Sequence, residues 1–91
     1  MSGSAEAAGN GQTVKVLFFA SAREAAGTPS ASFASDGSTL AELTADLIAA
    51  YGDLEPLLST CAIWVNGAPA RSTRVLRAGD EIAVLPPVSG G

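Results

Sequence analysis

The chain has 91 residues and a mass of 9.0 kDa, which is enough for one small domain with one hydrophobic core. Its net charge of −4 is the wrong sign for binding nucleic acid or anionic lipid. The absence of histidine and the single cysteine argue against a zinc site, a Cys-His nucleophile and an internal disulfide. The sequence has neither a secretion-signal pattern nor a long apolar span, so we expect a cytoplasmic protein that is not membrane-bound.

A polar arm, a strand and a short helix are predicted at the beginning of the chain. Residues 1–12 are rich in Ser, Gly and Ala, and we expect them to be disordered. Residues 13–20 are apolar at both alternating sets of positions, which predicts a strand at the centre of a sheet. Residues 21–27 predict one helical turn that ends at Gly27, and residues 30–35 predict a weaker strand.

The main helix is predicted to begin at Thr39. Thr39 and Glu42 have the spacing of a capping box, in which a hydroxyl and a carboxylate bind free amide N–H groups. Gly52 is suited to the C′ position after the helix. Apolar residues recur at helical spacing, which predicts one face packed on a sheet: Leu40, Leu43, Leu47, Ile48 and Tyr51.

The second half of the chain predicts shorter elements. Residues 54–60 predict a turn that packs Leu57 and Leu58. Residues 61–65 predict a strand that ends at the Asn66-Gly67 turn. A short edge strand is expected near residues 74–76.

The last predicted strand covers residues 81–85. Its alternation places Ile82 and Val84 inward, and Ala83 and Leu85 outward. Two prolines then end the strand because proline has no backbone N–H. One main helix among these strands is the pattern of an α+β roll.

The C-terminus is the most informative feature, since no side chains match a phosphate loop, a catalytic pair or a metal site. Residues 86–91 extend at most about 20 Å, far enough to enter a partner's active site. Gly90 and Gly91 have no Cβ and fit a narrow channel. Pro86 and Pro87 restrict the free tail and so lower the entropy cost of binding it. We therefore expect the Gly91 carboxylate to be the reactive group.

Four motifs of the chain are informative together: VKVLFFASAREAAG at 14–27, TLAEL at 39–43, VNG at 65–67 and GDEIAVLPPVSGG at 79–91. With these motifs, residues 13–91 resemble the ubiquitin-like β-grasp sulfur carriers of the MoaD/ThiS family, and most closely its small subunits of molybdopterin synthase. Carriers for thiazole synthesis are typically shorter and lack the opening at residues 18–24. The resemblance implies a β-grasp domain over residues 13–85, with a mixed sheet of four to five strands on one main helix, and a flexible tail over residues 86–91.

The resemblance also implies the chemistry. An E1-like (MoeB-like) enzyme would use ATP to adenylate Gly91, and a persulfide donor would supply sulfur for a thiocarboxylate. The tail would then enter the large, MoaE-like subunit, in a heterotetramer of two small and two large subunits. There the sulfur would attack cyclic pyranopterin monophosphate to build the dithiolene of molybdopterin. This chain would bind no cofactor or metal, and it would be no enzyme on its own.

An apolar patch is expected on the sheet face away from the helix. If the first and last strands are neighbours, as in the β-grasp, Leu17 and Phe19 lie beside Leu85, and Trp64 extends the patch. Contiguous exposed apolar surface of this kind marks interfaces. We expect this patch to dock the large subunit and, at other times, the activating enzyme, unless a loop or the edge strand covers it. The tail residues expected to contact a partner are Pro86, Pro87, Val88 and Ser89.

Other functions remain open at this point. A carrier for thiazole or cysteine synthesis would share the tail but use another partner. A protein modifier would be joined to lysines through Gly91, as ubiquitin is, and a passive interaction domain would not need its glycines. Cys61 is expected to be a small buried hydrophobe and not a sulfur acceptor.

Overall fold

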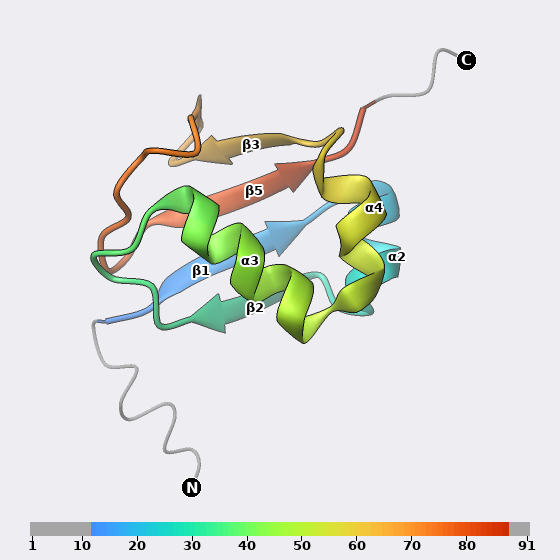
Figure 1. Cartoon of the computed structure of the whole chain (residues 1–91), viewed down its shortest axis with the longest axis horizontal. Helices are drawn as coiled ribbons and strands as arrows, with labels where there is room; N and C mark the ends of the chain where they lie inside the picture. The colour runs from blue at the N-terminus through green and yellow to red at the C-terminus, as the bar shows by residue number, and fades with distance from the viewer. Residues whose placement is uncertain (1–11, 88–91) are drawn as a thin grey trace, which may run out of the picture.

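The structure is a computed structural model that describes residues 12–87. Parts of two predicted segments, residues 1–11 of the arm and residues 88–91 of the tail, lie outside the described residues. The described elements run along the chain in this order: β1 (Val14–Phe18), α2 (Ala20–Ala26), β2 (Ser30–Phe33), α3 (Leu40–Ala50), η1 (Gly52–Leu54), α4 (Glu55–Leu58), β3 (Ala62–Val65), β4 (Ala68–Pro69) and β5 (Glu81–Leu85) (Figure 1).

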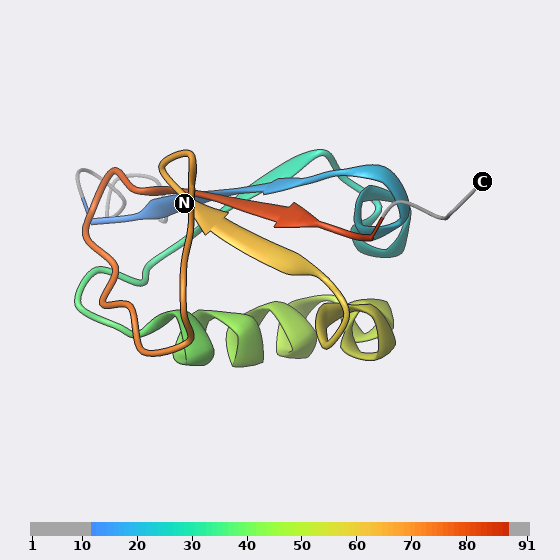
Figure 2. The same ribbon diagram turned by 90° about the horizontal axis from the view of Figure 1, so that it is seen from above.

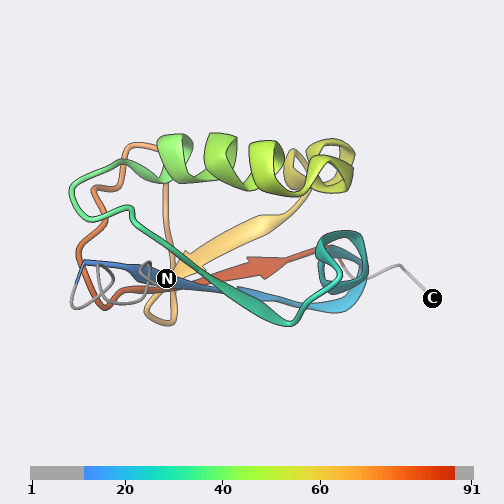
Figure 3. The same ribbon diagram turned by 90° about the horizontal axis from the view of Figure 1, so that it is seen from below.

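The strands form one mixed sheet in the order β2-β1-β5-β3-β4. β1 and β5 are parallel neighbours at its centre, and the other pairs are antiparallel. α3 crosses one face of the sheet, while α2 lies at the end of the sheet (Figures 2 and 3). The predicted α+β roll, with a mixed sheet of four to five strands packed on one main helix, is confirmed, and the sheet has five strands.

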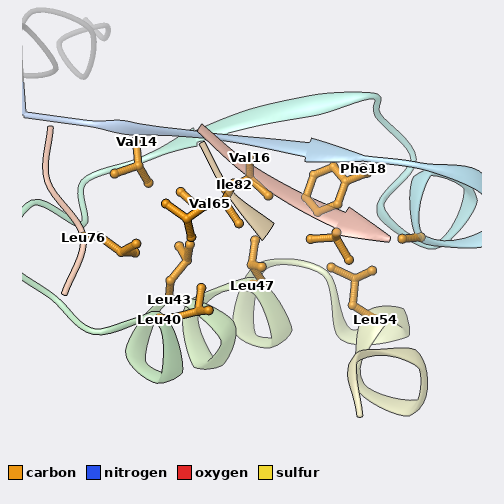
Figure 4. Close-up of a cluster of buried hydrophobic side chains, with 12 residues drawn as sticks. Val14, Val16, Phe18, Leu40, Leu43, Leu47, Leu54, Val65, Leu76 and Ile82 are labelled. Atoms are coloured by element: carbon orange, nitrogen blue, oxygen red, sulfur yellow. The ribbon is translucent and has the colours of Figure 1, made fainter. Parts of the chain in front are cut away.

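The core lies between α3 and the inner face of the sheet (Figure 4). β1 contributes Val14, Val16 and Phe18, in the alternation expected of a sheet with one covered face. The ring of Phe18 also meets Tyr51 edge to face, with centroids 5.6 Å apart. The other fully covered apolar side chains are Ala22, Leu40, Leu43, Leu47, Leu54, Val65, Leu76, Ile82 and Val84.

The start of α3 is closed by its own side chains and by a distant loop. The Glu42 N–H donates to Thr39 Oγ1 at 3.2 Å, and the Thr39 N–H donates to Glu42 Oε1 at 2.8 Å, which confirms the predicted capping box. The Leu40 N–H donates to the carbonyl of Arg74, and the Ala41 N–H donates to that of Ser72. These bonds satisfy the first amides of the helix and anchor the loop before β5.

The edge strand was predicted in the wrong place. β4 is Ala68–Pro69 and follows the Asn66-Gly67 turn at once, because both turn residues have positive φ, at 52° and 84°. Proline at this edge loses no ladder bond. Residues 74–76 form no strand: the Arg74 carbonyl binds α3, and Val75 makes only an isolated bridge to Thr39.

Gly52 stands at the predicted C′ position, directly after the C-cap residue Tyr51, but it does not take the left-handed conformation common there. The helix ends at Tyr51, and Gly52 begins the 3₁₀ turn η1, which buries Leu54 completely. The chain continues directly into α4, where Leu57 and Leu58 are half-buried and Leu58 packs on the core. The burial of Leu54 therefore stabilises η1, and the local sequence pattern did not predict this 3₁₀ turn.

Candidate functional site

The sheet face away from α3, here called the open face, carries the outward residues of β1, β5 and β3. The register sets Leu17 opposite Ala83, and Ala83 opposite Trp64. Leu85 lies opposite Ala62 in the same way. No helix of the described residues crosses this face (Figures 2 and 3).

The open face changes from charged to apolar along β1 and β5. Lys15 stands opposite Glu81 at the beginning of the two parallel strands. The Phe19 N–H donates to the carbonyl of Val84 at 3.3 Å, so Phe19 continues the ladder beyond β1. The apolar end of the face is therefore the end where β5 leads into the C-terminal tail.

Leu17, Phe19, Trp64 and Leu85, here called the apolar patch, lie on the open face toward this end, with Ala83 of β5 between Leu17 and Trp64. Phe19 is 44% exposed and Trp64 is 37% exposed, while Leu17 and Leu85 are half-buried. No loop or edge strand of the described residues buries the two aromatic rings. The predicted arrangement of these residues is thus present, and their role in partner binding stays a prediction.

The tail begins at the patch without an intervening loop. Pro86 is half-buried, Pro87 is exposed, and both follow directly on β5. Because β5 lies between β1 and β3, the tail leaves from the middle of the sheet (Figure 1). Val88, Ser89, Gly90 and Gly91 lie outside the described residues.

A buried carboxylate fixes the start of β5 and the hairpin that carries Trp64. Asp80 accepts the Asn66 side-chain amide and the Arg77 N–H, each at 2.8 Å. Asn66 Oδ1 accepts the Glu81 N–H at 2.9 Å. Burial alone would raise the pKa of Asp80, but these hydrogen bonds and the nearby Arg74 and Arg77 guanidinium groups together lower the pKa below its usual value.

This Asp80–Asn66 network was not predicted from the sequence. Each residue is common in turns, and only the fold brings positions fourteen apart into contact. The sequence indicated only that each residue stands in a turn, Asn66 in the hairpin and Asp80 before the last strand, and not that the two turns meet.

Cys61 is half-buried against the core, and burial raises the pKa of its thiol. Cys61 was predicted to be a buried hydrophobe and is less covered than that, and a raised pKa disfavours the nucleophilic thiolate. That Cys61 accepts no sulfur stays a prediction. Within residues 12–87, no group of three or more His, Cys, Asp or Glu side chains is placed to hold a metal ion. No helix in this part of the chain is long and apolar enough to cross a membrane.

Comparison with known proteins supports the sequence resemblance. The chain is 40% identical over 81 residues to a protein of Chlamydomonas reinhardtii named molybdopterin synthase sulfur carrier subunit, covering 86% of this chain and 98% of that protein. It is 33% identical over 79 residues to an Arabidopsis thaliana protein of the same name, covering 86% and 82%.

Solved structures share the fold. SAMP1 of Haloferax volcanii matches with a TM-score of 0.79 and 28% identity, covering 87% of this chain and 99% of that one. A chain in the complex of subunits 1 and 2 of the molybdopterin-converting factor of Helicobacter pylori matches with a TM-score of 0.65 and 30% identity, covering 87% and 99%. The family model of the ThiS family matches residues 16–91. The chain therefore belongs to the ThiS family, whose ubiquitin-like sulfur carriers its sequence resembles.

Proposed function

We propose that this chain is the sulfur-carrier subunit of a molybdopterin synthase, with the Gly91 carboxylate as its reactive group. The observation that carries the proposal is the root of the tail: the strand leading to Gly90-Gly91 ends beside an exposed apolar patch, in a chain that matches its family as far as Gly91. Relatives named as this subunit, at 40% and 33% identity, support the choice of pathway.

The chemistry needs no side chain of this domain. A carboxylate is a poor electrophile, so the Gly91 oxygen first attacks the α-phosphorus of ATP and pyrophosphate leaves. The terminal sulfur of a donor persulfide then attacks the acyl-adenylate and AMP leaves, which gives an acyl disulfide with the donor. A second thiol cleaves the S–S bond, so that the Gly91 thiocarboxylate is released and the donor and the thiol are oxidised to a disulfide. This sulfur is ionised and nucleophilic at neutral pH, and it displaces an oxygen of cyclic pyranopterin monophosphate to form a thioester between the chain and the pterin. Water then cleaves the thioester, which leaves the sulfur on the pterin and releases the chain as its Gly91 carboxylate. In this proposal the chain binds neither ATP nor the pterin, and it has no activity without its partners.

The open face explains how two partners use one tail. The large subunit docks on the apolar patch and takes residues 86–91 into its active site, as suggested by the fold's likeness to a chain of the Helicobacter pylori complex. The E1-like activating enzyme uses the same patch at a different step, so the two complexes exclude each other. We further propose a heterotetramer of two small and two large subunits, acting in the cytoplasm.

The cations that bind the pterin phosphate belong to the large subunit in this proposal. In residues 12–87, the outward side chains of β1, β3 and β5 include only one cation, Lys15, and it lies at the end of the open face away from the tail. Arg71, Arg74 and Arg77 lie on the loop before β5. Arg23 of α2 is the cation beside Phe19 at the tail end of the sheet, and this proposal assigns it no role in binding the phosphate.

The test is the intact mass of the chain after incubation with extract of its own cells, ATP and cysteine, followed by alkylation to trap thioacid. Exchange of one oxygen for sulfur, localised to Gly91, supports the proposal, and a chain lacking Gly91 is the matched control. An unchanged mass, with the activating enzyme shown to be present and active on a control carrier, contradicts it.

A protein modifier is the second candidate, favoured by the match to structures named small archaeal modifier protein 1, from Haloferax volcanii and Methanosarcina acetivorans. A modifier would use the same adenylate but pass Gly91 to a lysine amine. Isopeptide-linked conjugates that disappear when Gly91 is deleted would favour this function. Conversion of cyclic pyranopterin monophosphate to molybdopterin by the chain and its large subunit favours the carrier.

A further inference from the structure

Ala20 has an unusual backbone conformation directly beside the apolar patch. In residues 12–87, two residues other than glycine have positive φ: Asn66 at 52° and Ala20 at 50°. Asn66 lies in a two-residue hairpin turn, where asparagine tolerates this conformation. Ala20 lies in no hairpin and has no polar side chain to compensate, so turn chemistry does not explain its conformation.

The left-handed Ala20 allows β1 to pass into α2 with a single residue between them. β1 ends at Phe18, α2 begins at Ala20, and Phe19 remains extended with φ −121° and ψ 152°. Phe18 and Ala22 both reach the core within this short distance, at 2% and 0% exposure. The conformation at position 20 therefore decides the direction in which α2 leaves the strand.

Phe19 is fixed on both sides of its backbone while its ring stays exposed. Its N–H donates to the carbonyl of Val84 on β5 at 3.3 Å. Its carbonyl accepts the N–H groups of Ala22, at 3.0 Å, and Arg23, at 3.3 Å, in the first turn of α2. An aromatic side chain on a fixed backbone loses little conformational freedom when it docks.

We infer that Ala20 is a positioning residue, whose left-handed conformation holds Phe19 outward on the open face at the root of the tail. A residue with Cβ pays a conformational cost at positive φ, and such strain is found where the surrounding structure and function require it. The inference deepens the proposed function and rests on it, because Phe19 matters here only if the apolar patch docks the large subunit.

The test compares substitutions that accept or resist positive φ. Ala20→Gly and Ala20→Asn accept it, whereas Ala20→Val resists it because a β-branched side chain strongly disfavours this region. Ser21→Val is the matched control: it adds the same side chain at the next, exposed position of α2. The probe is the large subunit encoded in the same genome, titrated at a temperature where circular dichroism shows every variant folded.

We expect the Kd to rise at least about tenfold for Ala20→Val, and to stay within about threefold for Ala20→Gly, Ala20→Asn and Ser21→Val. A double-mutant cycle separates positioning from general damage. In a Phe19→Ala background, Ala20→Val should add little to the loss, because Ala20 acts through the Phe19 ring.

Three results would overturn the inference: a folded Ala20→Val chain with unchanged Kd, an equal loss for Ala20→Asn and Ala20→Val, or a full additional loss in the Phe19→Ala background. If Ala20→Val does not fold, D-alanine introduced at position 20 by chemical ligation replaces it. D-Alanine favours positive φ and should preserve the Kd, so tenfold weaker binding by a folded D-alanine chain rejects the inference. If Phe19→Asp itself leaves binding intact, the docking proposal fails instead.

Discussion

Side chains of the sheet alternate between its two faces, and these faces differ in their cover. α3 packs on one face, and no helix of the described residues packs on the other (Figure 2). On the covered face, the inward residues of β1 and β5 meet α3 and are almost completely buried. On the open face, the neighbouring outward residues include apolar side chains with no cover in the described structure. The comparison teaches that one set of apolar residues stabilises the domain, whereas the other is available for a partner.

Leu47→Ala breaks the covered face and gives the largest expected effect on stability. Leu47 is fully buried between α3 and the sheet, so truncation loses buried area and leaves a cavity. We expect unfolding to become about 2–5 kcal/mol easier, a large part of the stability of a small domain. Urea unfolding measures this loss. A change below about 1 kcal/mol would contradict the assignment of Leu47 to the core.

Phe19→Asp places a charge on the open face. In contrast to Leu47→Ala, it should weaken partner binding and leave the stability of the domain nearly unchanged. A charge at the centre of a docking surface costs about 2 kcal/mol or more in binding, which is roughly a thirtyfold rise in Kd. Stability should change by less than about 1 kcal/mol because the ring is 44% exposed. Calorimetric titration against the large subunit measures the affinity, and Val75→Asp is the control. Val75 is also exposed, at 42%, but lies on the loop before β5.

Asp80→Ala sharpens the comparison because it removes the hydrogen bond that joins the hairpin turn to the residue before β5, and β5 contributes residues to both faces. The substitution leaves the Asn66 amide and the Arg77 N–H without their acceptor, and we expect a loss of about 1–3 kcal/mol. Chemical unfolding at neutral pH measures it, with exposed Asp53→Ala as the control.

The same carboxylate predicts an acid-dependent loss of stability. The folded pKa of Asp80 lies below its ordinary value of 3.8, so folding favours the ionised form. Its stabilising contribution is complete well above pH 3.8 and disappears as the pH falls through the lower folded pKa. Stability curves of the natural chain and of Asp80→Ala should therefore converge below about pH 4. Parallel curves down to pH 2 would refute this assignment.

Ser35→Ala has the smallest expected effect and the opposite sign. Ser35 is 1% exposed, and its hydroxyl has no hydrogen-bond partner among residues 12–87. Removing a buried, unpaired hydroxyl should be neutral or stabilise the domain by up to about 1 kcal/mol. Thermal unfolding checks the sign. A clear loss of stability would indicate that the hydroxyl binds a buried water.

The sequence predicted those parts of the fold that depend on neighbours along the chain. The capping box at Thr39, the helical end at Gly27 and the alternation of β5 are all local patterns, and all are confirmed. The edge strand was misplaced because the pairing of residues 74–76 depends on the distant start of α3.

The candidate site was also predictable only in part, namely where it follows from the pairing of strands. Leu17, Phe19 and Leu85 could be placed together once β1 and β5 were taken as neighbours, which the resemblance supplied and the structure confirms. The Asp80–Asn66 contact and the left-handed Ala20 have no local signal, because each arises from tertiary packing. The roles of Gly90 and Gly91 rest on the sequence, since both lie outside the described residues.

The most direct test of the two-face account measures stability and large-subunit affinity together for Leu47→Ala and Phe19→Asp. The account predicts that Leu47→Ala lowers the free energy of unfolding and leaves the Kd of the folded fraction unchanged. It predicts that Phe19→Asp raises the Kd about thirtyfold or more and leaves the free energy of unfolding nearly unchanged. A Phe19→Asp chain that is folded and binds the large subunit as tightly as the natural chain would contradict the account.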